Sequence, residues 1–361
     1  MVYRLLFQLV LRRIPAETAH SIAARSLPLL ARIPLLRRAL APRDPRLEVN
    51  ALGLTFPSPL GAAAGVDKDA TWFGGLAAIG FGCVEVGTVT AVAQEGNPKP
   101  RVFRLIRDRA LLNSMGFPNA GAEAVARRLR ARAGRTIVGV NVGKSKLAPI
   151  DRAADDYRAS VRHLAPHAAY LALNVSSPNT PGLRELQGVE QLDALVAEVR
   201  DELRAIGVSL PLLVKIAPDL SDEAIDAIGE LALRQRLDGI VAVNTTLARD
   251  GLKSPVGDRP GGVSGAPLKR RALEVLRRLS AKVDGSVVLI SVGGVEGPDD
   301  AWERILAGAT LVQAYTGFVY GGPLWPRRVN RGLAARVRDA GAASIQDLVG
   351  TGARRLTGSS R

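Results

Sequence analysis

The sequence is short of cysteine and of aromatic residues, and each shortage excludes a class of protein. A single cysteine, Cys83, in 361 residues cannot form an internal disulfide, an iron–sulfur cluster or a structural zinc site. Cys83 lies inside an apolar run, where a buried and inert thiol is expected. An aromatic content of 4% argues against an all-β sandwich. The composition therefore favours an α/β protein of a reducing compartment.

Histidine is equally scarce, and its placement argues against a metal centre. The chain has three histidines, of which His163 and His167 are four residues apart. Pro166 interrupts the helix that would put both on one face, and no third ligand follows. We expect both to be structural and predict no metal site.

Acidic residues are outnumbered, yet the pattern of positive charge does not indicate a nucleic-acid surface. The net charge is +15, from 49 basic and 34 acidic residues, and 41 of the basic residues are arginine. Abundant arginine beside alanine and glycine is typical of GC-rich coding. No basic stretch is interleaved with aromatic residues, and no helix-turn-helix or zinc-finger spacing occurs. We therefore predict no nucleic-acid partner.

No apolar run is long enough to cross a bilayer, which takes about 20 residues, but the amino terminus is amphipathic. In "MVYRLLFQLVLRR", Arg4, Gln8 and Arg12 recur every fourth residue and form a narrow polar stripe on an apolar helix. The next 25 residues predict one or two further helices, broken at Pro28 and Pro34. Seven arginines and one acid in residues 1–40 favour an anionic membrane surface.

Two alternatives to a membrane-surface module stay open for these residues. A secretory signal peptide would explain the apolar start, although Arg4 and Gln8 interrupt its core and no convincing cleavage site follows. A helical hairpin packed on the protein's own body would show a similar pattern. Our prediction is peripheral attachment to the cytoplasmic side of the cell membrane.

Short apolar runs recur eight times beyond residue 50, with amphipathic helical stretches between them. The runs are residues 59–65, 83–89, 137–143, 170–176, 212–217, 240–246, 287–294 and 311–317. Alternation of strands and helices indicates a parallel sheet, and eight units close into a (β/α)₈ TIM barrel. We predict a helical module at residues 1–44, a barrel at 45–345 and a disordered basic tail at 346–361.

Polar residues follow nearly every predicted strand, where a barrel carries its chemistry. They are Asp67, Lys68, Thr88, Asn141, Asn174, Ser177, Asn179, Lys215, Asn244, Thr245, Gly293, Gly294, Tyr315 and Thr316. The glycine pair and "YTG" occupy the last two strand ends, where barrels bind phosphate through backbone N–H groups. A Rossmann fingerprint is missing, so FMN fits better than NAD as the bound cofactor. Amides around a lysine suit a flat, anionic ligand such as a pyrimidine.

The ordered motifs of the chain resemble those of one known family. They are "GAAAGVDKDA", "GTVTAVAQEGNPKPRVFRL", "NSMGFPN", "LNVSSPNTPGLRELQ", "VKIAPDL", "VNTT", "GGVSGAPL" and "AYTGFVYGGP". Together they are similar to class 2 dihydroorotate dehydrogenases, the membrane-associated, quinone-reducing type. The resemblance implies oxidation of (S)-dihydroorotate to orotate in pyrimidine biosynthesis, one FMN per chain, and a helical module that guides quinone to the flavin. The oligomeric state is left open, and a monomer is expected if the helices dock on a membrane.

The resemblance implies roles for individual residues. Ser177 would be the catalytic base, activated by its site, plausibly through water and neighbours such as Thr180. Substrate would be held by Lys68, Asn113, Ser114, Met115, Gly116, Phe117, Asn174, Asn179, Asn244 and Thr245. FMN would contact Ala64, Gly65, Val66, Asp67, Lys68, Thr88, Asn141, Asn174, Lys215, Val243, Gly265, Gly294, Tyr315 and Thr316. His20 and Arg104 would line the quinone tunnel.

Other functions remain possible on the same residues. Class 1 relatives use a cysteine base, whereas Ser177 occupies the matching position here and Cys83 belongs to another strand. A second reading keeps barrel and flavin but makes fumarate or NAD the oxidant. A third treats the chain as a flavin-free scaffold at a membrane surface. The choice between menaquinone and ubiquinone is left open.

Overall fold

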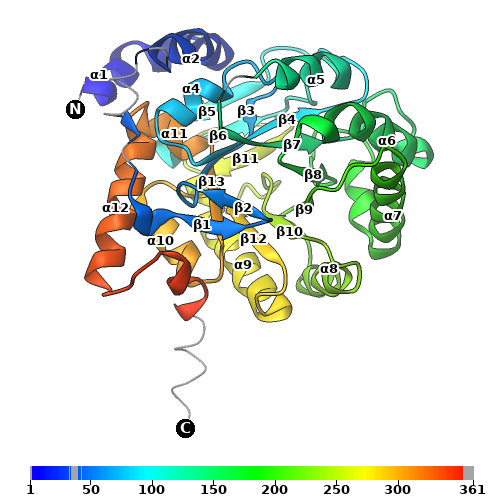
Figure 1. The fold of residues 1–361 in the computed structure, drawn as a ribbon. Helices are drawn as coiled ribbons and strands as arrows, with labels where there is room; N and C mark the ends of the chain where they lie inside the picture. Colours follow the sequence, from blue (N-terminus) through cyan, green and yellow to red (C-terminus); the bar gives the residue numbers. More distant parts are fainter. Residues whose placement is uncertain (1, 32, 34–39, 42, 133, 353–361) are drawn as a thin grey trace.

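Eight parallel strands form a closed barrel at the centre of the molecule (Figure 1). The computed structural model describes residues 2–31, 33, 40–41, 43–132 and 134–352. The barrel strands are β3 (Leu60–Asp67), β4 (Cys83–Val89), β7 (Ile137–Val142), β8 (Tyr170–Asn174), β9 (Leu212–Ile216), β10 (Gly239–Ala242), β12 (Val288–Val292) and β13 (Leu311–Ala314). Strand β13 pairs with β3 and closes the ring. The predicted (β/α)₈ barrel is confirmed, and each of the eight apolar runs overlaps one of its strands.

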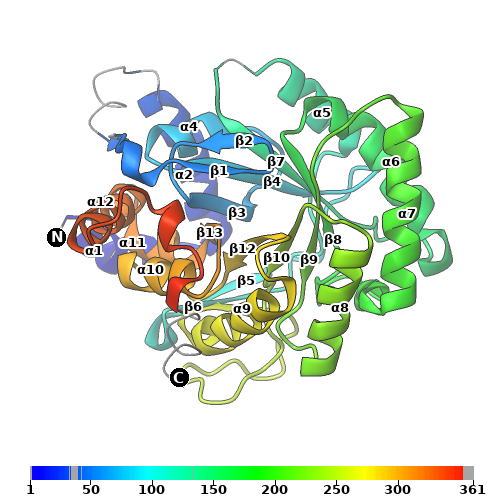
Figure 2. The same cartoon turned by 60° about the horizontal axis from the view of Figure 1, so that its bottom comes forward.

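Helices surround the barrel and cover its outer face (Figure 2). They are α4 (Phe73–Ala78), α5 (Ala122–Arg130), α6 (Ala153–Leu164), α7 (Val189–Ala205), α8 (Asp222–Arg234), α9 (Lys269–Val283), α10 (Pro298–Leu306), α11 (Thr316–Gly321) and α12 (Trp325–Asp339). Helix α8 shows why such segments form: Ser221 caps its first turn by accepting from Ala224 N at 3.2 Å, and Ile225, Ile228 and Leu231 are buried.

Two small antiparallel sheets were not predicted. Strands β1 (Val49–Ala51) and β2 (Leu54–Phe56) form a hairpin. Strands β5 (Val102–Leu105), β6 (Ala110–Asn113) and β11 (Gly262–Gly265) form a three-stranded sheet in which β6 is central. Strands of three or four residues are too short to show a periodic pattern. The three-stranded sheet matters for function, because Leu111, Asn113 and Ser264 from it line the main cavity.

The amino-terminal segment forms two helices, α1 (Val2–Leu9) and α2 (Ala16–Ala31), beside α4 and α11 (Figure 1). Helix α1 packs against α11 through Phe7, whose ring centroid lies 5.2 Å from that of Tyr320. The predicted break at Pro28 is wrong, because α2 continues to Ala31. Gly75 of α4 lets the helices approach: a Cβ there would lie 2.9 Å from the Leu27 carbonyl carbon. This packing offsets the loss of the backbone hydrogen bond that Pro28 cannot donate.

Pro34, the second predicted break, lies outside the described residues. Among the helices of the described ranges, none has both the length and the apolarity needed to cross a membrane.

The barrel domain extends past its predicted end at residue 345. A 3₁₀ turn, η8 (Gln346–Leu348), follows, and Gln346 Oε1 accepts from Asn50 N at 2.9 Å. Gly350 N donates to Ile305 O at 3.0 Å. Residues 346–352 are thus fixed to the barrel by hydrogen bonds, and they do not belong to a disordered tail. The remainder of the predicted tail, residues 353–361, lies outside the described residues.

Candidate active site

The largest group of predicted site residues meets in one cavity at the carboxyl ends of the barrel strands. Its wall contains Ala64, Gly65, Lys68, Thr88, Asn113, Met115, Gly116, Phe117, Asn174, Ser177, Asn179, Lys215, Val243, Asn244, Thr245, Gly265, Gly294, Tyr315 and Thr316. Parallel strands present their carboxyl ends at the same rim, so residues far apart in sequence converge there. Of the strand-end residues expected to share one mouth, all line this cavity except Asp67 and Asn141. Their roles stay predictions.

Four asparagines form hydrogen-bonded pairs in this wall. Asn179 Nδ2 donates to the Asn113 backbone and side-chain oxygens, both at 3.3 Å. Asn244 Nδ2 donates to Asn174 Oδ1 at 3.3 Å and to Ser176 Oγ at 3.0 Å. Amide side chains held in this way have a defined orientation, so their remaining donors and acceptors can select one orientation of a ligand.

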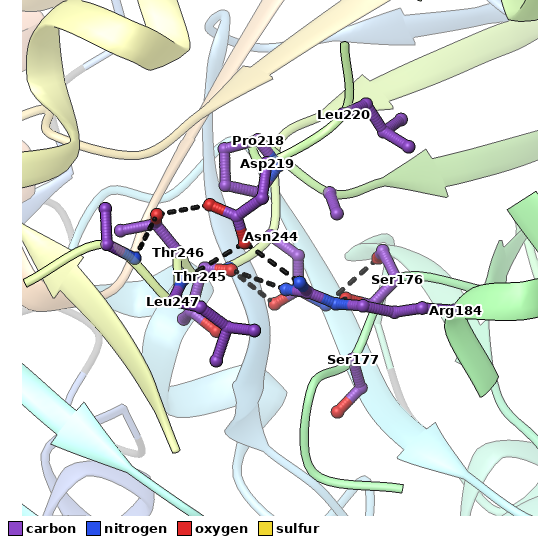
Figure 3. A network of polar contacts seen from close by, with 12 residues as sticks. Ser176, Ser177, Arg184, Pro218, Asp219, Leu220, Asn244, Thr245, Thr246 and Leu247 are labelled. Atoms are coloured by element: carbon purple, nitrogen blue, oxygen red, sulfur yellow. Dashed lines mark hydrogen bonds and ion pairs between the residues drawn. The ribbon is translucent and has the colours of Figure 1, made fainter. Parts of the chain in front are cut away.

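Ser177 lies on the loop that follows β8, and its hydroxyl is nearly free of protein partners. Its Oγ accepts one hydrogen bond, from Asn179 N at 3.2 Å, and the residue is 4% exposed. The side chain points away from the neighbouring polar network (Figure 3) and contributes to the cavity wall. The hydroxyl can therefore face a bound ligand.

A network around Arg184 holds this loop to two other strand ends (Figure 3). Arg184 donates to Ser176 O at 3.2 Å and to Thr245 O at 3.3 Å, and it pairs with Asp219 at 2.9 Å. Asp219 also accepts from Leu247 N at 3.0 Å. Arg184 and Asp219 belong to motifs that carry the family resemblance, but the sequence alone predicts no role for either residue.

Glu85 does not line the cavity but lies close to Lys215 of its wall, and the sequence alone predicts no role for it. Its carboxylate, fully buried on β4, accepts from Asn141 Nδ2 at 2.8 Å, Gln313 Nε2 at 2.9 Å and Tyr170 OH at 3.2 Å. Lys215 Nζ lies 3.7 Å from it. The available signal was a carboxylate in the middle of the apolar strand "CVEVGTV", because a buried charge requires partners.

Lys68 follows β3 and provides a cation at the cavity. Its Nζ donates to Gly65 O at 2.8 Å. Burial is the main cause that lowers the pKa of Lys68 to about 8, against the raising effect of Glu17 and Asp69. An anionic ligand beside this ammonium would stabilise its charged form.

Three predicted contacts lie behind the cavity wall. Val66 is buried in the core, and Asp67 accepts from Thr71 N and Trp72 N, both at 2.9 Å. Asn141 is fully buried and accepts from Thr88 Oγ1 at 2.6 Å and from Asn174 Nδ2 at 3.0 Å. Asn141 thus positions Thr88 and Asn174 of the wall, whereas the partners of Asp67 do not line this cavity. Direct contact of Val66, Asp67 and Asn141 with a cofactor stays a prediction.

Ser114, which was also predicted to bind substrate, does not line this cavity. Its backbone N–H donates to Arg101 O at 2.9 Å, and it borders a neighbouring hollow with Lys146 and Arg259.

His20 and Arg104 lie in two separate hollows between α2 and the barrel, which share Glu17, Ser21 and Arg101. The His20 ring packs edge-on against Trp72 at 5.4 Å, and burial lowers its pKa to about 3. Arg104 Nη1 donates to Ile14 O at 2.8 Å. The structure therefore places both residues at the interface between the helical module and the barrel, but not side by side, and a quinone tunnel there stays a prediction.

The other sequence predictions concern residues outside the cavity. Cys83 is buried, and burial raises the pKa of its thiol to about 12. His163 is exposed and His167 is half-buried, and neither lines the cavity. Within the described ranges, no three His, Cys, Asp or Glu side chains are grouped to hold a metal ion.

Comparison with known proteins agrees with this geometry. The family model described as "Dihydroorotate dehydrogenase" matches residues 46–337. The chain belongs to this family. A relative from Thermobifida fusca, named dihydroorotate dehydrogenase (quinone), is 55% identical over 97% of this chain and 96% of its own length. A relative of the same name from Streptomyces coelicolor is 54% identical over 98% of this chain and 100% of its own length.

Solved structures of the family have the same fold. The structure of Eimeria tenella DHODH in complex with ferulenol has a TM-score of 0.87 and 39% identity, over 94% of this chain and 96% of that chain. A ligand-free structure from the same organism has a TM-score of 0.85 and 38% identity. The family resemblance inferred from the motifs is confirmed.

Proposed function

We propose that this chain is a quinone-dependent dihydroorotate dehydrogenase, which oxidises (S)-dihydroorotate to orotate in pyrimidine biosynthesis. The observation that carries the proposal is the joint placement of Ser177, four asparagines and Lys68 in one cavity whose far wall is rich in glycine. Amide donors and acceptors match the ring amides of a pyrimidine, and an ammonium matches its carboxylate.

Ser177 is the base in this proposal. Oxidation removes a proton from C5 and a hydride from C6 of the substrate, which leaves a C5=C6 double bond. Ser177 Oγ takes the C5 proton while its own hydroxyl proton passes to water, and the hydrogen bond from Asn179 N leaves one lone pair of Oγ available for this step. The asparagines and Lys68 hold the ring and carboxylate so that C5 faces the hydroxyl.

The remaining wall fits FMN. Gly293 and Gly294 have φ angles of 108° and 73°, a backbone conformation that favours glycine, and the turn they form at the cavity can bind a phosphate through its backbone N–H groups. Lys215 is positioned to stabilise negative charge on the isoalloxazine ring, and Thr88, Gly265, Tyr315 and Thr316 complete the wall. Bound FMN would supply the chemistry of hydride acceptance from C6 and of electron transfer to a quinone.

The helical module supports a quinone acceptor and a peripheral location at the membrane, which we place on the cytoplasmic face as part of this proposal. Helix α1 buries Phe7 against the barrel but exposes Leu5, Leu6 and Leu9, by 54%, 46% and 58%. Such an apolar surface suits the interfacial region of a bilayer. Replacing these three leucines with serine should abolish co-sedimentation with anionic vesicles, whereas binding as strong as that of the parent protein would contradict membrane attachment.

The choice of acceptor tests the proposed function. Purified protein should reduce a short-chain quinone in the presence of dihydroorotate, with little activity toward fumarate or NAD⁺. Faster turnover with fumarate or NAD⁺ than with the quinone would identify that compound as the electron acceptor instead. Protein purified without flavin, and unable to bind added FMN, would instead favour a scaffold.

A further inference from the structure

Arg304, near the end of α10, is a buried arginine that the proposed chemistry does not use. It is 1% exposed, and its Nη2 donates to Gly293 O at 3.1 Å and to Lys269 O at 2.6 Å. Its Nη1 is buried and has no hydrogen-bond partner in the described part of the chain. A buried guanidinium with unused donors is costly, so its retention calls for a reason.

The charges around this arginine are unevenly paired. Lys269 pairs with Glu296 at 2.8 Å and with Asp300 at 2.9 Å, and Arg109 pairs with the same Glu296. Arg304 has no carboxylate within 4.0 Å among residues 2–352 as described. Glu303 also lies near Arg304, but it pairs with Arg277 at 3.3 Å. The remaining cluster holds three cations and two carboxylates, which leaves one positive charge for an anion.

Arg304 contacts the turn that would bind that anion. Gly293 and Gly294 both line the cavity. Arg304 does not line it, but its guanidinium donates a hydrogen bond to the Gly293 carbonyl oxygen. Its second contact, Lys269 O, belongs to the first residue of α9, and a Cβ on Gly294 would lie 2.7 Å from Lys269 N. One side chain therefore fixes both segments that shape the glycine turn.

We propose that Arg304 is a positioning residue for the cofactor phosphate: it holds the Gly293–Gly294 turn open toward the phosphate and supplies the positive charge that balances it. The inference rests on the proposed function, because it needs FMN in this cavity. It assigns to Arg304 a part of the selectivity for FMN over riboflavin, which has the same ring system without the phosphate.

A flavin exchange experiment isolates the phosphate. The purified holoenzyme is incubated to equilibrium with an excess of FMN and riboflavin in equal amounts, and the bound flavins are then extracted and separated. Replacing Arg304 by methionine should lower the ratio of bound FMN to bound riboflavin by about tenfold or more, since the charge and the bond to the turn are both lost. Arg304→Lys should stay within about threefold of the parent ratio, because it keeps the charge.

Arg277→Met is the matched control. Arg277 also carries a positive charge near α10, but it is 53% exposed and pairs with Glu303. Its removal should leave the ratio unchanged, which excludes a general effect of net charge.

Several results would overturn the inference. An Arg304→Met protein with the parent ratio would show that Arg304 only stabilises the fold, even if both flavins bind more weakly. If the methionine variant does not fold, Arg304→Lys decides, and a tenfold loss of selectivity there contradicts the role of charge. A parent protein that binds neither flavin would instead refute the proposed function itself.

Discussion

Lys215 and Glu85 face each other inside the barrel, with Nζ 3.7 Å from Oε1 and side chains that are 6% and 0% exposed. The pair links the layer of side chains inside the barrel to the cavity above it, because Lys215 lines the cavity and Glu85 does not.

Removing the carboxylate should leave the Lys215 ammonium buried and unpaired. Glu85→Gln should therefore lower the free energy of unfolding by about 3–5 kcal/mol, measured by urea unfolding and circular dichroism. The double variant Glu85→Gln/Lys215→Met should recover part of the loss, with a coupling energy of about 1–3 kcal/mol. Additive losses would show that the two residues do not interact.

Ser177→Ala tests the assignment of the base. We expect turnover with dihydroorotate to fall by about 10²–10⁴, because no proton acceptor replaces the hydroxyl. The dissociation constant of orotate should change little, since the asparagines remain. Ser160→Ala is a matched control, as Ser160 is equally buried but lies on α6, outside the cavity. Normal turnover in the Ser177 variant would contradict the proposed role.

Lys68 should make orotate binding depend on pH. Its lowered pKa of about 8 means that the ammonium is present below this pH and is lost as the pH rises through it. The dissociation constant of orotate, followed by flavin absorbance, should therefore increase between pH 7 and pH 9. A constant affinity over this range would show that Lys68 does not pair with the carboxylate. Lys68→Met should bind orotate weakly at every pH.

The ion pair between Glu17 and Arg101 joins α2 to the barrel. Arg101 Nε and Nη2 both lie 3.1 Å from Glu17 Oε1, and the arginine side chain is 7% exposed. Glu17→Gln should weaken this attachment by about 1 kcal/mol, because Glu17 is partly solvated. We expect slower quinone reduction, whereas the anaerobic reaction with saturating dihydroorotate should be unchanged; loss of the Glu17 charge near Lys68 should act on substrate affinity alone.

Glu123→Gln provides the comparison for this variant, since Glu123 is an exposed acid on α5. Equal loss of both half-reactions in Glu17→Gln would mean that the pair supports the whole barrel, and not specifically the helical module.

The barrel was predictable because each strand is a contiguous apolar run that ends in polar residues. The rim was predictable for the same reason: Asn174, Lys215 and Asn244 occupy equivalent strand ends, so the fold alone brings them together. Glu85 could not be placed from the sequence, since its partners come from four other strands and define its role only in three dimensions.

Short segments and tertiary contacts account for the other differences. Strands β5, β6 and β11 have four residues each and are stabilised by pairing with one another, which local pattern does not reveal. Pro28 suggested a helix end on local grounds, but packing of α2 on Gly75 overrides that preference.

The most direct test of the proposed function separates its two half-reactions. Dihydroorotate is added to the purified holoenzyme under anaerobic conditions, the flavin absorbance is followed, and a short-chain quinone is then supplied. The account predicts bleaching with dihydroorotate and rapid recovery with the quinone. A bound flavin that dihydroorotate does not bleach would contradict it, and the asparagines of the cavity would then have to bind a different ligand.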